Sequence, residues 1–178
     1  MPRLIETRAR TEVLMAAVND LLHHEGVRSL SLRRIARASG ISTSSMLHHY
    51  GTQEHLFRVV AARTGRARVT DISQRLYFEK VSAFLPDTPE QLALATAWQA
   101  WIQLARAESA WQRGVDEMLD KERGLLALEL ELPYHDDRVA AVSALVEGLV
   151  GAMSRPLRPL PAEHARRVFE ATVAALLA

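Results

Sequence analysis

Apolar residues recur at helical spacing along most of the chain, and no segment alternates with the period of two expected of a half-buried strand. The first predicted helix spans about residues 6–25 and ends before Gly26. Two short helices follow within residues 31–50, and another begins near Thr52 with apolar positions that cover them. The pattern therefore predicts an all-α protein with a three-helix N-terminal head.

The rest of the chain continues the helical pattern after an arginine-rich stretch at residues 63–68, which contains Gly65. We expect a seam there, with a first domain at 1–66 and a second at 67–178. Further helices are predicted at about 67–84, from Thr88 and Pro89 onward, at about 109–132, at about 136–153 and after the proline-rich loop 154–161. The total is about nine helices.

The last two predicted helices carry wide apolar faces bordered by small residues. Such faces either complete the core or pair with a second copy across a twofold axis as a four-helix interface. Either use fits the pattern, and the second would make a homodimer. The residues of the expected interface are Val139, Val142, Val146, Leu149, Val150, Val168, Thr172, Val173 and Leu176.

Residues 31–50, SLRRIARASGISTSSMLHHY, have the layout of a helix-turn-helix. Ser31 and Ser42 are good N-cap residues, and Gly40 suits the left-handed position after the first helix. Met46 and Tyr50 lie four apart and therefore share the face that anchors the second helix. A helix-turn-helix of this layout inserts its second helix into the major groove of DNA.

The face opposite that anchor is polar and basic. Thr43, Ser44, Leu47 and His48 are predicted to point outward from the second helix, and Arg33, Arg34 and Arg37 lie on the first. A helix pair that serves only for packing is the alternative, but a merely solvated face would carry both charges, and residues 31–50 contain no acid. The pattern favours DNA binding.

Charge is divided unevenly along the chain. Residues 1–68 hold eleven arginines, no lysine and five acidic residues, a balance of +6, whereas residues 69–178 hold eleven basic and sixteen acidic residues, a balance of −5. A basic head on an acidic remainder suits a DNA-binding module fused to something else, and its binding should weaken as salt rises. With no secretory signal evident and no apolar run of the roughly 20 residues that span a bilayer, we expect a cytoplasmic protein without membrane contact.

Other chemistry finds little support. Cysteine is absent, and adjacent histidines such as His23 and His24 point about 100° apart on a helix, which is poor for a shared metal ion. No paired carboxylates, nucleophile elbow or glycine-rich phosphate loop is visible. We therefore expect no enzyme, no metal and no cofactor.

Aromatic residues gather in the middle of the chain. Filling the core is the plain interpretation, but an apolar cavity with a few polar anchors is what a small-molecule sensor requires. The residues assigned to such an effector site are Tyr77, Phe78, Trp98, Trp101, Trp111 and Met118.

The head resembles the tetracycline-repressor (TetR) family of bacterial regulators. The residues that carry the resemblance are Glu25-Gly26-Val27, Ile35-Ala36, Ala38, Gly40-Ile41-Ser42, Met46, His49-Tyr50, Thr52, Glu54 and Leu56-Phe57. The resemblance implies a homodimer on a near-palindromic operator, with a C-terminal pocket for a small inducer. It also implies that Ser42, Thr43 and Ser44 contact phosphates or base edges and that His48 reaches bases. Ser31 is expected to contact a phosphate, and His49 a phosphate or the nearby DNA backbone.

Two positions depart from the family pattern. Leu47 stands where the family usually has a tyrosine that contacts the DNA backbone, and Gln53 stands where it usually has lysine. Leu47 is able to contact a thymine methyl group instead, and Arg33, Arg34 and Arg8 are candidates for compensating contacts. The sequence thus predicts a transcriptional regulator, a repressor released by an inducer. A DNA-binding protein without an effector, and an all-α enzyme or metal-binding protein on this scaffold, remain as alternatives.

Overall fold

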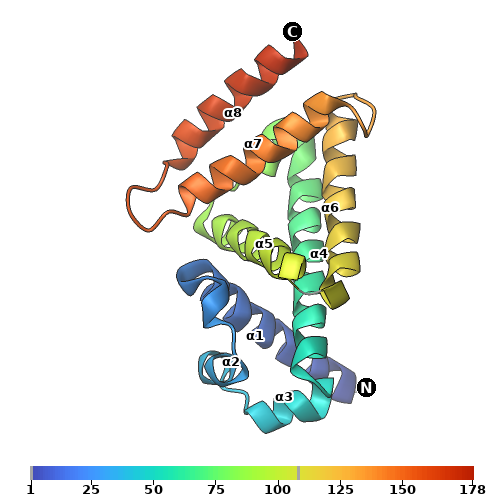
Figure 1. Cartoon of the computed structure of the whole chain (residues 1–178), viewed down its shortest axis with the longest axis vertical. Coiled ribbons are helices and arrows are strands. Elements are labelled where there is room, and N and C mark those ends of the chain that lie inside the picture. The colour runs from blue at the N-terminus through green and yellow to red at the C-terminus, as the bar shows by residue number, and fades with distance from the viewer. Residues whose placement is uncertain (1, 108) are drawn as a thin grey trace.

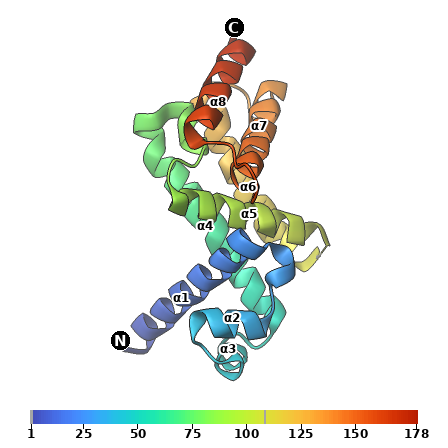
Figure 2. The ribbon, with the colours of Figure 1, turned by 90° about the vertical axis from the view of Figure 1, so that its left-hand side faces the viewer.

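The computed structural model describes residues 2–107 and 109–178, with side chains described for residues 9–107 and 111–178. The described residues form eight α-helices and two short 3-10 helices and contain no strand, as the all-α prediction requires. Figures 1 and 2 show a head of α1–α3 at one end and α7 and α8 at the other, joined by α4, α5 and α6.

The head consists of α1 (Pro2–Glu25), the 3-10 helix η1 (Val27–Ser29), α2 (Leu32–Ser39) and α3 (Thr43–Tyr50). The predicted stops and caps are present. Gly26 has φ 72° and Gly40 has φ 69°, values that glycine adopts without a steric penalty. The Ser31 and Ser42 hydroxyls each accept a hydrogen bond from the backbone N–H three residues ahead.

The expected seam at Gly65 does not break a helix. Instead, α4 runs without interruption from Gln53 to Glu79 and is followed by the 3-10 helix η2 (Lys80–Phe84). The separate helix predicted from residue 67 was therefore wrong, and the proposed boundary between residues 66 and 67 lies inside α4. Gly65 serves close helix packing rather than a break, since a Cβ atom there would lie 2.7 Å from Met118 Cγ and 2.9 Å from Trp98 Cη2.

The remaining helices are α5 (Pro89–Ala107), α6 (Ser109–Glu129), α7 (Asp137–Met153) and α8 (Ala162–Leu177). The start of α5 has the predicted reciprocal cap. Gln91 N–H donates to Thr88 Oγ1 at 3.3 Å, and Thr88 N–H donates to Gln91 Oε1 at 3.1 Å. Asp136 caps α7 by accepting from Arg138 N–H at 2.9 Å.

Two apolar cores hold the molecule together. The first joins the head to α5 and α6 and contains Leu14, Ile35, Met46, Leu56 and Trp101. The second lies between η2, α6, α7 and α8. Because α5 and α6 contribute to the head's own core, the head is packed onto the helices above it rather than tethered by a loose linker.

Candidate functional site

The exposed face of the helix-turn-helix is held by a buried opposite face. Met46 and Tyr50 on α3 are buried, and the hydroxyls of Tyr50 and Thr11 share a hydrogen bond of 2.9 Å. Ile35 anchors α2 in the same core. These contacts fix the orientation of α3 relative to α1, which is the requirement for presenting one helix to a groove.

The predicted contact residues lie together on the outer side of this anchor. On α3 and its N-terminus, Ser42, Thr43, Ser44, Leu47, His48 and His49 are all exposed, as are Arg33 and Arg34 on α2 and Gln53 at the start of α4. Ser31 is half-buried and caps α2. Figure 2 shows α2 and α3 side by side at the end of the molecule farthest from α8.

Two details of this face were not foreseen. The Arg34 guanidinium forms an ion pair with Glu25, which lies at the end of α1 outside the acid-free run. The Ser42 and Ser44 hydroxyls lie 3.1 Å apart in a hydrogen bond with each other. Arg34 is therefore partly neutralised, whereas Arg33 and Arg37 are exposed cations. The side chain of Arg8, a candidate for a compensating contact, lies outside the described residues.

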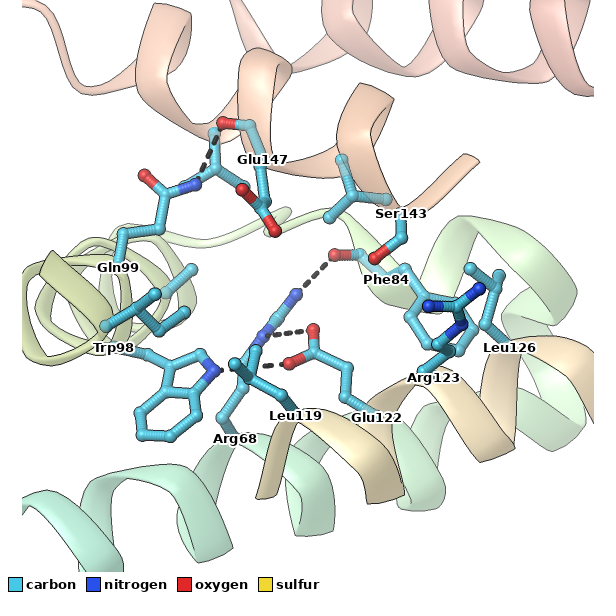
Figure 3. A pocket seen from close by; sticks show the side chains of 14 residues that line it. Arg68, Phe84, Trp98, Gln99, Leu119, Glu122, Arg123, Leu126, Ser143 and Glu147 are labelled. Carbon is cyan, nitrogen blue, oxygen red and sulfur yellow. Dashed lines mark hydrogen bonds and ion pairs between the residues drawn. The ribbon is translucent and has the colours of Figure 1, made fainter. Parts of the chain in front are cut away.

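A pocket lies between α4, η2, α5, α6 and α7. Figure 3 shows Arg68 rising from α4 into its centre, with Glu122 from α6 beside it. The volume in which the centre of a water molecule fits is about 40 Å³. The lining residues are Arg68, Phe84, Ala95, Trp98, Gln99, Ile102, Leu119, Glu122, Arg123, Leu126, Ser143, Val146, Glu147 and Val150.

The polar centre of the pocket is a buried ion pair. Arg68 is 2% exposed, and its Nε lies 3.5 Å from Glu122 Oε1. Glu122 Oε2 accepts a hydrogen bond from Trp98 Nε1 at 3.3 Å. Burial raises the pKa of the Glu122 carboxyl and lowers the pKa of the Arg68 guanidinium, while their mutual attraction opposes both shifts. Removing either partner alone would leave the other group buried without its counterpart, which is costly.

The six residues assigned to an effector site are not brought together. Trp98 lines the pocket, but Trp101 and Trp111 belong to the head's core, where their rings pack edge-to-face with Phe57. Met118 lies in the same core. Tyr77 and Phe78 point outward on α4 and are 78% and 82% exposed. The error arose because aromatic content alone does not tell which side of a helix faces a cavity.

The pocket's charged residues were missed, although a signal for them existed. On α4 the buried series Ala61, Gly65, Arg68, Ile72 keeps helical spacing, so Arg68 occupies a core position. On α6, Glu122 stands four residues after the buried Met118. A charge within a buried stripe is a site indicator, but Arg68 was assigned to the arginine-rich stretch at residues 63–68 that was expected to mark a seam.

Most of the residues predicted to form a dimer interface are buried within their own chain. The α7 residues Val139, Val142, Val146, Leu149 and Val150 are buried within their own chain in the second core, as is Val173 on α8. Thr172 and Leu176 are half-buried, and Val168 is exposed. The wide apolar face of α7 therefore completes the core, which was the alternative use of that pattern.

No metal site is indicated in the part of the chain that the structure describes, where no group of three or more His, Cys, Asp or Glu side chains is placed to hold an ion. Within the same residues, no helix is long and apolar enough to cross a membrane.

The geometry of the head agrees with comparisons to known proteins. Residues 14–60, which contain the helix-turn-helix, match the model of bacterial regulatory proteins of the tetR family. The chain is 26% identical over 176 residues to the HTH-type transcriptional regulator PksA of Bacillus subtilis, covering 89% of this chain and 85% of that protein. The helix-turn-helix head of the chain, residues 14–60, is therefore of the TetR type.

Other relatives agree with that assignment. The HTH-type transcriptional repressor AcnR of Corynebacterium glutamicum is 29% identical over 85 residues, which are 48% of this chain and 44% of AcnR. A transcriptional regulator from a Rhodococcus species has the same fold, with a TM-score of 0.81 at 21% identity over 94% of this chain and 95% of that one. The chain thus carries a TetR-type DNA-binding helix-turn-helix, and the curated proteins that it resembles are transcriptional regulators.

Proposed function

We propose that this protein is a homodimeric repressor of the TetR family that holds a near-palindromic operator with α3 and releases it when a small molecule enters the pocket around Arg68. The observation that carries the proposal is the continuity of α4. One helix begins at Gln53, beside the DNA-facing surface, and places Arg68 in the pocket. At 1.5 Å per residue these positions are separated by roughly 22 Å of rigid helix.

The outer face of α3 supports groove recognition. His48 and the hydroxyls at its N-terminus are exposed on a helix whose inner face is fixed, so they are free to reach base edges and phosphates. Leu47, 37% exposed, offers an apolar surface to a thymine methyl group in place of a tyrosine contact. Arg33 supplies phosphate contact, and Arg34 supplies another once DNA competes with Glu25.

The exposed faces of α7 and α8 support a dimer. With the valine stripe buried inside the chain, the outer side of α7 presents small residues, among them Ala141, Ala144 and Gly148. Val168 and Ala171 are exposed on α8. Small residues allow helices of two copies to approach closely in a four-helix arrangement. A dimer supplies two heads for half-sites about 34–36 Å apart.

The closed state of the pocket supports release by a ligand. A space of about 40 Å³ for water centres holds on the order of three waters, so a larger molecule must push the helices apart. Because α4 forms one wall and Gly65 lies against Trp98 and Met118, that displacement moves the head. Two proteins of the same fold were solved with small cations, one from Saccharomonospora viridis with choline and the multidrug binding protein EbrR with ethidium.

A DNA-binding protein without an effector is less well supported. That alternative requires a filled middle domain, whereas a pocket with a polar centre borders Trp98.

Selection of bound sequences from random DNA duplexes at two salt concentrations tests the proposal. A palindromic consensus, with affinity that falls steeply as salt rises, is the expected result. His48→Ala should relax the preference at one position in each half-site, and Arg33→Ala should weaken binding to all sequences alike. Failure to enrich any sequence would refute DNA recognition, and a non-repeated consensus bound by a monomer would refute the dimer.

A further inference from the structure

The Arg68 guanidinium in the pocket has one nitrogen that no acceptor satisfies. Its Nη2 donates to the backbone oxygen of Phe84, and its Nε faces Glu122. Its Nη1 is buried without a hydrogen-bond partner among the described residues, and Asp71 Oδ2 lies 3.8 Å from it. Asp71 is engaged more closely by Arg75, at 2.9 Å.

An unmet donor in a buried site favours a ligand that brings an acceptor. Buried N–H groups are almost always paired, because leaving one unpaired forfeits its hydration without return. Figure 3 shows the guanidinium of Arg68 in the centre of the pocket, between Trp98 and Glu122 and below α7. Nη1 has almost no exposed surface, so a ligand oxygen reaches it only after the helices around the pocket part, and it would then satisfy Nη1 without displacing either existing partner.

The charges around the pocket argue against an ionic ligand. Arg68 is balanced by Glu122, and the other two charged lining residues, Arg123 and Glu147, are also opposite in sign. Arg123 is held over the Tyr134 ring, 5.0 Å from its centroid, and its Nε donates to the Tyr134 carbonyl. The charges that line the pocket therefore sum to zero, so a buried ligand charge would leave the site with a net charge.

The rest of the lining requires an apolar body. Phe84, Leu119, Leu126, Val146 and Val150 form most of the wall around the ion pair. We propose that the effector is an uncharged, mainly hydrocarbon molecule with a carbonyl oxygen that accepts a hydrogen bond from Arg68 Nη1. This inference rests on the proposed function, since it assigns a chemical class to the effector of that pocket.

Four compact probes of matched shape test the inference by calorimetric titration of the full chain: cyclohexanone, cyclohexane, cyclohexanecarboxylate and cyclohexylammonium. Cyclohexanone should bind about tenfold more tightly than cyclohexane, the difference expected of one hydrogen bond to a charged donor. Both ions should bind more weakly than cyclohexanone. Tighter binding of either ion, or equal affinity for cyclohexanone and cyclohexane, would overturn the inference.

Two variants connect the preference to Arg68. The double change Arg68→Met with Glu122→Leu removes both buried charges together, because removing one alone strands the other and risks unfolding. This variant should bind cyclohexanone and cyclohexane equally well. The matched control Arg66→Met removes an exposed α4 cation that does not line the pocket, and it should keep the tenfold preference. A preference retained in the double variant would show that Arg68 does not recognise the oxygen.

Release of DNA, measured on the same samples with the selected duplex, separates this inference from the proposed function. If cyclohexanone binds with the expected preference but leaves the DNA complex intact, the inference stands and effector-controlled release fails. If a charged probe binds best and releases DNA, release stands and the inference fails. Absence of binding by all four probes would overturn the inference. The selection of bound DNA duplexes would then still test whether the protein recognises an operator.

Discussion

Gly65→Ala is the sharpest test of how the pocket and the head communicate. An added Cβ would lie 2.7 Å from Met118 Cγ, and 2.9 Å from both Met118 Cβ and Trp98 Cη2. Ordinary carbon contacts are about 3.5–4.0 Å, so α4 must move away from α5 and α6 by roughly 1 Å. This displacement is in the direction that a ligand wedged into the pocket would produce.

The expected changes in unfolding free energy and in DNA affinity differ in size, so each is measured separately. Overpacking costs about 1–3 kcal/mol, while replacing glycine by alanine within a helix returns about 1 kcal/mol. We therefore expect the free energy of unfolding to fall by about 0–2 kcal/mol. If the displaced α4 carries the head with it, affinity for the selected DNA should fall by roughly 5–150-fold without any ligand, the range of ordinary allosteric couplings.

Urea unfolding and DNA titration by fluorescence anisotropy measure the two effects on one preparation. Gly114→Ala is the matched control, because an added Cβ on that α6 residue meets nothing within 4 Å. It should raise stability by about 1 kcal/mol and leave DNA affinity unchanged. Gly65→Ala protein that is as stable as this control and binds DNA like the unaltered chain would refute the packing argument.

Three further changes probe other parts of the molecule. Glu25→Gln should release Arg34 to the DNA, tightening binding and steepening the salt dependence by up to about one unit of slope; an unchanged slope in salt titrations would refute this. Ala144→Glu on the exposed side of α7 should give monomers in sedimentation without lowering the melting temperature, and persistent dimers would refute the proposed interface. Hydrogen bonds from Arg138 hold the pKa of Asp136 at about 2, below its usual 3.8. This carboxylate therefore stabilises the fold above about pH 4, and its contribution is lost as pH falls toward 2. The melting temperature of the unaltered chain should exceed that of Asp136→Asn above pH 4 and converge with it near pH 2, and a gap that persists at pH 2 would refute the charge argument.

The head was predictable because its determinants are local. Ser31, Gly40 and Ser42 act through backbone groups within a few residues of themselves, so their roles follow from the sequence alone. The role of Gly65 was misread because it depends on α5 and α6, whose side chains approach α4 too closely for a residue with a Cβ atom. Nothing near it in the sequence carries that information.

The apolar stripe of α7 illustrates a second limit. Val142 and Val146 must be buried, but periodicity does not tell whether their own chain or a second copy covers them. The sequence signal for the pocket is the presence of charged residues at buried positions rather than the aromatic residues. Arg68 and Glu122 each interrupt an apolar stripe, and only the pairing of α4 with α6 brings them together.

Because Arg68 on α4 and Glu122 on α6 form a buried pair, substitutions at these two positions are expected to occur together. Loss of either partner alone leaves an uncompensated charge, which costs about 3–5 kcal/mol, a large part of the stability of an ordinary domain. A single substitution of Arg68 or Glu122 therefore destabilises the fold and is removed by selection before it can alter the ligand preference of the pocket. Diversification among close descendants should proceed instead through half-exposed rim positions such as Gln99 and Ser143, with the two central positions changing together or not at all.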